Sequence, residues 1–182
     1  MRQAASVFAI LLLTTTATYA QKSQSPYAGQ EKRDIKSLSP EEIEAYANGQ
    51  GMGFAKAAEL NHYPGPKHVL ELASELHLSE QQIEATKKIF DRMHGEAVRL
   101  GILVVDREKK LDSLFARKQI DSKRLRLAVA EIARLQGDLR SAHLRAHLSM
   151  KQLLSASQIS KYEELRGYSQ PGEHKEHRHG EQ

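Results

Sequence analysis

Histidine and methionine side chains recur at helical spacing in the last third of the chain. His143, His147 and Met150 lie at i, i+4 and i+7, so a helix would carry them along one edge. Two imidazoles one turn apart can hold Zn²⁺, Ni²⁺ or Cu²⁺, and a thioether adds a softer ligand. The alternative is that these residues cover the edge of a packed helical seam, and both interpretations stay open at this stage.

A third histidine joins this pair if the chain folds back on itself. In an antiparallel hairpin that turns near residue 119, His94 falls opposite His143, at positions that face each other across the seam. The sequence therefore predicts that His94, His143 and His147 converge into one metal site.

The C-terminal tail is the second candidate for metal binding. It contains His174, His177 and His179 within Glu173–His179, and histidine-rich tracts bind transition metals. The alternative is a solubilising tail with incidental affinity. His62 and His68 flank a Pro-Gly-Pro loop, but isolated loop histidines are seldom ligands.

A binding surface for extended apolar chains is predicted from a different set of residues on the same segment. Leu144 and Leu148 are one helical turn apart and off the predicted seam, with Arg140 and Arg145 beside them. Apolar area surrounded by cations suits loose, reversible binding. The alternative is that these leucines pack under a following helix or within a dimer.

Catalytic motifs are missing from the sequence. It has no G-x-S-x-G, no H-E-x-x-H, no phosphate-binding loop and no cysteine nucleophile. We therefore expect a binding protein, with no required cofactor, in place of an enzyme.

The first twenty residues predict export. Arg2 precedes the apolar run Val7–Leu13, and Thr18-Tyr19-Ala20 places small residues where a signal peptidase cleaves. We expect cleavage after Ala20 and a periplasmic protein without a membrane span. With 27 basic and 23 acidic residues mixed along the chain, nucleic acid is not an expected partner, and the absence of cysteine leaves packing alone to hold the fold.

Three segments begin with the pattern of a helix capping box. An apolar residue precedes Ser, and Glu or Gln follows three residues later, so the Ser hydroxyl and the Glu or Gln side chain can satisfy each other's backbone amides. The three segments are Leu38–Glu42, Leu78–Gln82 and Leu154–Gln158.

Apolar periodicity predicts two long helices after the second box. Residues 80–116 and 122–153 carry apolar residues at three- and four-residue steps, and Asp121 is placed to cap the second helix. Gly95 and Gly101 weaken the first and favour a bend. Because the connection is short, the fold class expected is all-α, with a long antiparallel helical hairpin.

Shorter elements flank the hairpin. A helical segment from Pro40 breaks at 48–53, a short helix runs from the loop 61–66 to Leu76, and another spans about 156–167. The domain organisation expected is therefore a signal peptide at 1–20, a disordered leader at 21–37, a helical domain at 38–167 and a disordered tail at 168–182.

The paired motifs resemble the Spy/CpxP family of periplasmic stress proteins, whose signature is two L-T-x-x-Q segments. Here Leu78, Ser79 and Gln82 form the first, and Leu154, Ser155 and Gln158 the second, with Ser in place of Thr. The resemblance covers about residues 66–167.

This resemblance implies two hairpins paired into a curved homodimer. Members bind unfolded envelope proteins without ATP, restrain a membrane sensor protein, or bind metal, and metal-sensing relatives use His and Met just before the second motif. The resemblance therefore predicts an envelope-stress chaperone or adaptor, with a heavy-metal sensing or resistance protein as the alternative.

Overall fold

The computed structural model describes residues 25–168, which fall into two units. The first, up to Glu31, is described only from Ser25 and consists of turns and the start of a 3₁₀ helix, η1 (Gln30–Lys32). The second begins at Lys32. The predicted signal peptide and most of the predicted tail, including His174, His177 and His179, lie outside the described residues.

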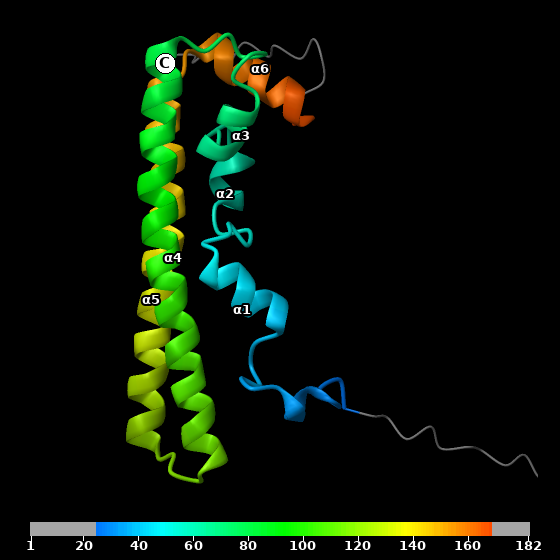
Figure 1. The fold of residues 1–182 in the computed structure, drawn as a ribbon, viewed down its shortest axis with the longest axis vertical. Coiled ribbons are helices and arrows are strands. Elements are labelled where there is room, and N and C mark those ends of the chain that lie inside the picture. Colours follow the sequence, from blue (N-terminus) through cyan, green and yellow to red (C-terminus); the bar gives the residue numbers. More distant parts are fainter. Residues whose placement is uncertain (1–24, 169–182) are drawn as a thin grey trace, which may run out of the picture. The chain divides into compact units, whose positions relative to one another are not determined.

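The second unit is all-α within residues 32–168, as the sequence predicts. Helices α4 (Glu80–Ala116) and α5 (Ser122–Leu153) form the long antiparallel hairpin (Figure 1). Their bounds match the predicted ranges. The turn between them is short, and Lys118 takes a left-handed φ of 54° to close it.

Side-chain caps set the starts of four helices. Ser39, Ser79 and Ser155 each accept the N3 amide in a complete capping box, and these boxes begin α1 (Pro40–Ala47), α4 and α6 (Ala156–Arg166). Asp121 accepts the Arg124 amide at 2.8 Å and begins α5. All four predicted caps are confirmed.

The hydrophobic core divides into two clusters along the hairpin. One lies around the middle of the hairpin and combines residues of both long helices with Ile35, Leu38 and Tyr46 from the segment before and in α1. The other lies at the motif end and contains Val69, Leu76, Met150, Leu154, Ile159 and Tyr162. The flanking helices thus bury apolar surface that the hairpin alone would leave exposed.

Gly101 allows α1 to touch the backbone of α4. A Cβ at this position would lie 2.0 Å from the Tyr46 carbonyl oxygen, a distance no real contact reaches. Helix α4 continues through Gly95 and Gly101. Gly101, which the sequence predicts to weaken α4, is therefore needed for the close packing of α4 against the end of α1.

The flanking segments differ from the prediction in three places. Helix α3 (Pro66–Glu71) ends before Leu76, because residues 72–78 turn to place Leu76 in the core and His77 adopts a φ of 48°. A short α2 (Lys56–Glu59) was not predicted. Ile35 is only 2 % exposed, so the packed domain begins before residue 38.

Across residues 25–168 the structure contains no helix with the length and apolar character that crossing a bilayer requires.

Candidate functional site

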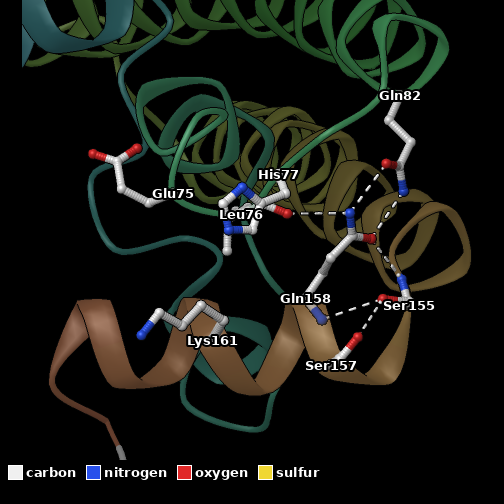
Figure 2. Close-up of a pocket in the computed structure, with 8 residues that line it drawn as sticks. All are labelled: Glu75, Leu76, His77, Gln82, Ser155, Ser157, Gln158 and Lys161. Atoms are coloured by element: carbon white, nitrogen blue, oxygen red, sulfur yellow. Dashed lines mark hydrogen bonds between the residues drawn. The ribbon is translucent and has the colours of Figure 1, made fainter.

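The two motif glutamines meet side by side at the open end of the hairpin. Gln82 Nε2 donates to Gln158 Oε1 at 2.9 Å, and Gln158 Nε2 donates to Gln82 Oε1 at 3.1 Å. Figure 2 shows the two amides facing each other beside Ser155. We call this pair the glutamine clasp. It joins the starts of α4 and α6, which are 76 residues apart in sequence.

Each amide of the glutamine clasp has all its hydrogen bonds satisfied. The second N–H of Gln82 donates to the Leu153 carbonyl at 3.2 Å, and that of Gln158 to the Leu76 carbonyl at 3.3 Å. Each Oε1 also accepts the backbone amide of its own capping serine. With two donors and two acceptor sites used on both sides, the clasp is a structural lock and holds no spare group for a ligand.

A solvent-open pocket of about 490 Å³ lies beside the clasp, between the turn before α4 and the start of α6. Its rim carries one acidic and one basic side chain, Glu75 and Lys161, as Figure 2 shows. His77 and Ser157 also line it. The pocket has mixed polarity and points to no particular ligand.

The three predicted histidines lie under one segment of the chain, residues 48–65, which we call the strap. His94 Nε2 donates to the Asn48 carbonyl at 3.1 Å. The His143 ring stacks on Phe54 with centroids 5.8 Å apart. His147 Nδ1 donates to the Tyr63 carbonyl at 2.7 Å. Each histidine therefore holds a different point of the strap against the hairpin.

His143 is the least satisfied of the three. It is 4 % exposed, and its Nε2 is buried without a hydrogen-bond partner among the described residues. Burial lowers the pKa of His143 below its usual value, and the nearby His147 and His94 lower it further. The ring is thus held neutral in the folded protein.

A polar cluster that sequence reasoning missed surrounds Glu59 of the strap. Tyr162 of α6 donates to Glu59 Oε1 at 2.5 Å, and Tyr168 donates to the same oxygen at 3.2 Å. Arg166 Nε lies 3.6 Å from this oxygen, and His147 Nδ1 lies 3.6 Å from Oε2. Burial, followed by the bond to Glu59, raises the pKa of Tyr162, so its hydroxyl stays a donor.

The cluster around Glu59 joins the strap to both α5 and α6. Gly65 is part of this contact, because a Cβ there would lie 3.0 Å from His147 Cε1. Nothing in the spacing of these residues signals the cluster, since its members come from segments about a hundred residues apart. Glu59 falls between the predicted break at 48–53 and the predicted loop at 61–66, where no pattern singles it out.

The residues predicted to form the helix metal site lie near one another but are engaged in other contacts. Residues 25–168 contain no group of three or more His, Asp or Glu side chains placed to hold a metal ion. Met150 is fully buried in the motif-end core, away from solvent. His94 and His147 each donate from one ring nitrogen to a backbone carbonyl of the strap, and the other ring nitrogen of each is not used in that bond.

The four residues predicted to bind apolar chains differ in exposure and in their contacts. Leu148 is 53 % exposed, whereas Leu144 is half-buried. Arg140 is exposed, but Arg145 forms a two-pronged ion pair with Glu96 of α4, at 2.9 Å to each carboxylate oxygen. Leu148 and Arg140 therefore remain available to a partner, and Arg145 links the two long helices.

A second open pocket, of about 720 Å³, lies between α5, α6 and the strap. Buried Leu154 and Ile159 line it together with the small residues Ala156, Ser157 and Ser160. His62 Nδ1 donates a hydrogen bond to Glu163 Oε1 at its rim, at 2.6 Å.

Comparisons with protein-family models, with curated proteins and with solved structures find no match to this chain.

Proposed function

We propose that this chain is a periplasmic, ATP-independent chaperone or envelope-stress adaptor that binds unfolded proteins. The proposal rests on the paired Leu-Ser-x-x-Gln motifs, on the signal-like first twenty residues and on the surface of the hairpin. The all-α hairpin agrees with the fold that the resemblance to the Spy/CpxP family implies, and the contact between its two motifs is an additional feature of this chain.

The observation that carries the proposal is the exposure of large apolar side chains along a hairpin whose core is already filled. Leu148 is 53 % exposed although its neighbours Ala146, His147 and Met150 are buried, and Ile102 of α4 is 52 % exposed. Such side chains supply area for apolar segments of a client, and cations such as Arg140 keep the surface soluble. Binding a client through many weak contacts of this kind does not require ATP hydrolysis.

The test is aggregation of a chemically denatured client protein at stoichiometric ratios. We expect the protein to slow aggregation and Leu148→Gln with Arg140→Gln to reduce the effect several-fold. Leu165→Gln is the matched control, because Leu165 is also exposed (41 %) but lies on α6. An unchanged aggregation rate with the unsubstituted protein would contradict the chaperone proposal.

The proposal includes pairing of two copies and a membrane sensor protein as a second kind of partner, as the resemblance implies. Sedimentation velocity over a range of concentrations tests for a homodimer. Pull-down from envelope extracts, with the unsubstituted protein and with Leu148→Gln, separates the two kinds of partner. A membrane sensor is captured as one defined species, whereas unfolded clients are captured as a mixture.

Metal binding is the second candidate function, favoured by the orientation of the histidines. His94 and His147 each donate one ring N–H to a backbone carbonyl, as metal-binding histidines commonly do, and the Nε2 of His143 lies buried between elements without a partner. A rearrangement of the strap that brought these rings together would form a site for Zn²⁺, Ni²⁺ or Cu²⁺.

Titration calorimetry with these three metals tests the second candidate. The helix site predicts that His143→Ala/His147→Ala abolishes binding, whereas removal of residues 173–182 does not. If the tail deletion alone removes all binding, the helix site is wrong and His174, His177 and His179 carry the affinity.

A further inference from the structure

The turn end of the hairpin carries the net positive charge of the whole chain. Residues 113–130 contain five basic side chains and one acidic side chain, Asp121. Removing them from the totals of 27 basic and 23 acidic residues leaves 22 of each in the rest of the chain. The basic residues are Arg117, Lys118, Lys123, Arg124 and Arg126, and all five are exposed.

Four of these five cations take no part in an ion pair within residues 25–168. Arg124 is the exception, because it pairs with Asp121 at 3.6 Å and donates to the Gln119 carbonyl within the turn. Elsewhere on α5 the arrangement differs, since Arg134 pairs with Asp138 and Arg145 with Glu96. Charge at the turn end is therefore available to an anionic partner.

Large apolar side chains are exposed at the same end. Phe115 of α4 is 53 % exposed, and Leu125, Leu127 and Val129 of α5 are 39 %, 59 % and 48 % exposed. No flanking helix covers them, because the turn end projects beyond α1, α2, α3 and α6 (Figure 1). Exposed apolar groups among exposed cations are typical of an interaction surface.

The exposed apolar groups of α5 do not all share one face. Leu125 and Val129 are one helical turn apart and lie on the same side, whereas Leu127 points about 200° away from Leu125 around α5. Phe115 adds exposed apolar area from α4. A rigid groove on a folded partner contacts one side of a helix, whereas a fluid lipid surface can close around several sides.

We propose that the turn end of the hairpin docks on a membrane surface rich in anionic lipid. The basic side chains contact the headgroup phosphates, and Phe115, Leu127 and Val129 enter the boundary between headgroups and acyl chains. The long stems of Lys and Arg let their charges stay at the phosphates while the apolar groups sit deeper. The contact is peripheral and leaves the rest of the hairpin in water.

This docking goes beyond the proposed chaperone or adaptor function and does not depend on it. Leu127 and Leu148 are 21 residues apart on one helix, which corresponds to about 32 Å. Docking at the turn end would therefore leave the surface around Leu148 free for a client.

A tryptophan reporter makes the test local, because the chain has no Trp of its own. Leu127→Trp places one at the turn end, and Leu148→Trp is the matched control at an exposed leucine of the same helix. Both variants are measured in the full chain and in a chain that starts at Gln21, so that the apolar run Val7–Leu13 cannot account for binding.

Vesicles of phosphatidylcholine with and without phosphatidylglycerol are the probes. We expect a blue shift of emission for Leu127→Trp with anionic vesicles only, reversed by high salt, and no shift for Leu148→Trp. No shift at residue 127, an equal shift with neutral vesicles, or equal shifts at both positions would each overturn the proposal. A response to polyglutamate without a response to vesicles would assign the surface to an acidic protein and also overturn it.

Flotation of the chain without an added Trp gives a second measurement. Lys118→Gln/Lys123→Gln/Arg126→Gln should weaken binding to anionic vesicles on the order of a hundredfold. The control Lys87→Gln/Arg99→Gln/Arg134→Gln removes the same charge from exposed positions elsewhere on the hairpin. Equal weakening by both triple variants would show that only net charge matters and would reject a turn-end site.

Discussion

The two ends of the hairpin are built on the same two helices but are stabilised in different ways. At the motif end, α3, α6 and the strap cover the helices, and the glutamine clasp closes the junction. At the turn end, the seam residue Leu125 is 39 % exposed and no flanking α-helix covers the two long helices. Burial at one end and exposure at the other separate a structural region from a surface available to partners.

This difference shows that the long heptad pattern does not decide where the protein is stable. Ile132, Leu135 and Leu139 are buried, yet Leu125 and Ala128 of the same seam are not fully covered. Stability follows the flanking segments, since they bury apolar area. Local opening should therefore be easiest at the turn and hardest at the motif end.

Truncation of a core side chain should have the largest effect and the sharpest contrast between the ends. Met150→Ala should lower the free energy of unfolding by about 2 to 5 kcal/mol, because Met150 is fully buried. Leu125→Ala should cost less than about 1 kcal/mol. Urea unfolding followed by circular dichroism measures both. Similar losses at both positions would mean that the two ends are equally packed.

Breaking the glutamine clasp should have the next largest effect. Gln82→Glu keeps the cap of Ser79 but removes the two N–H donors and places a carboxylate against Gln158 Oε1. We expect a loss of about 2 to 3 kcal/mol. Glu42→Gln is the matched control, since the first capping box is exposed and has no paired amide, and it should change stability by less than about 0.5 kcal/mol.

The cap of α5 should matter less, and its effect should stay local. Asp121→Ala removes the acceptor for the Arg124 amide and should cost about 1 kcal/mol. Amide hydrogen exchange should quicken in residues 122–128 and stay unchanged near Met150. Faster exchange at the motif end would show that the two ends are coupled more tightly than the core clusters indicate.

The smallest expected effect is the contribution of His143 to the pH dependence of stability. Burial lowers the pKa of this ring below the ordinary value of 6.5 in the folded protein, so the unfolded chain takes up the proton first. The neutral His143 ring therefore leaves the free energy of unfolding undiminished above pH 6.5, and this free energy falls as the pH drops below 6.5. Unfolding titrations at pH 7.5 and 5.5 should show a smaller difference for His143→Leu than for the unsubstituted protein, whereas His94→Gln should keep most of it.

Much of the hairpin could be predicted because its signals are local. Capping serines, Asp121 and apolar periodicity act within a few residues, and they predicted the bounds of α4 and α5. Local rules failed for α3, because tertiary packing draws Leu76 into the core and ends the helix early. They also missed Ile35, an isolated aliphatic residue in a mostly polar leader, because its burial depends on the distant α4.

The candidate site was less predictable, because it depends on how distant segments meet. Spacing predicts that His143 and His147 share one edge of α5 and that His94 of α4 lies opposite, but the strap that covers them has no periodic pattern. The contact between Tyr162 and Glu59 joins residues 103 apart. Capping explained Gln82 and Gln158 one at a time, and no local rule indicates that each completes the other.

The glutamine clasp has a consequence for how such a sequence can change over time. Each amide supplies what the other lacks, so a substitution at residue 82 removes the reason for glutamine at residue 158. We therefore expect the two positions to vary together among descendants of this chain, as a compensated pair, while the capping serines beside them exchange with threonine independently.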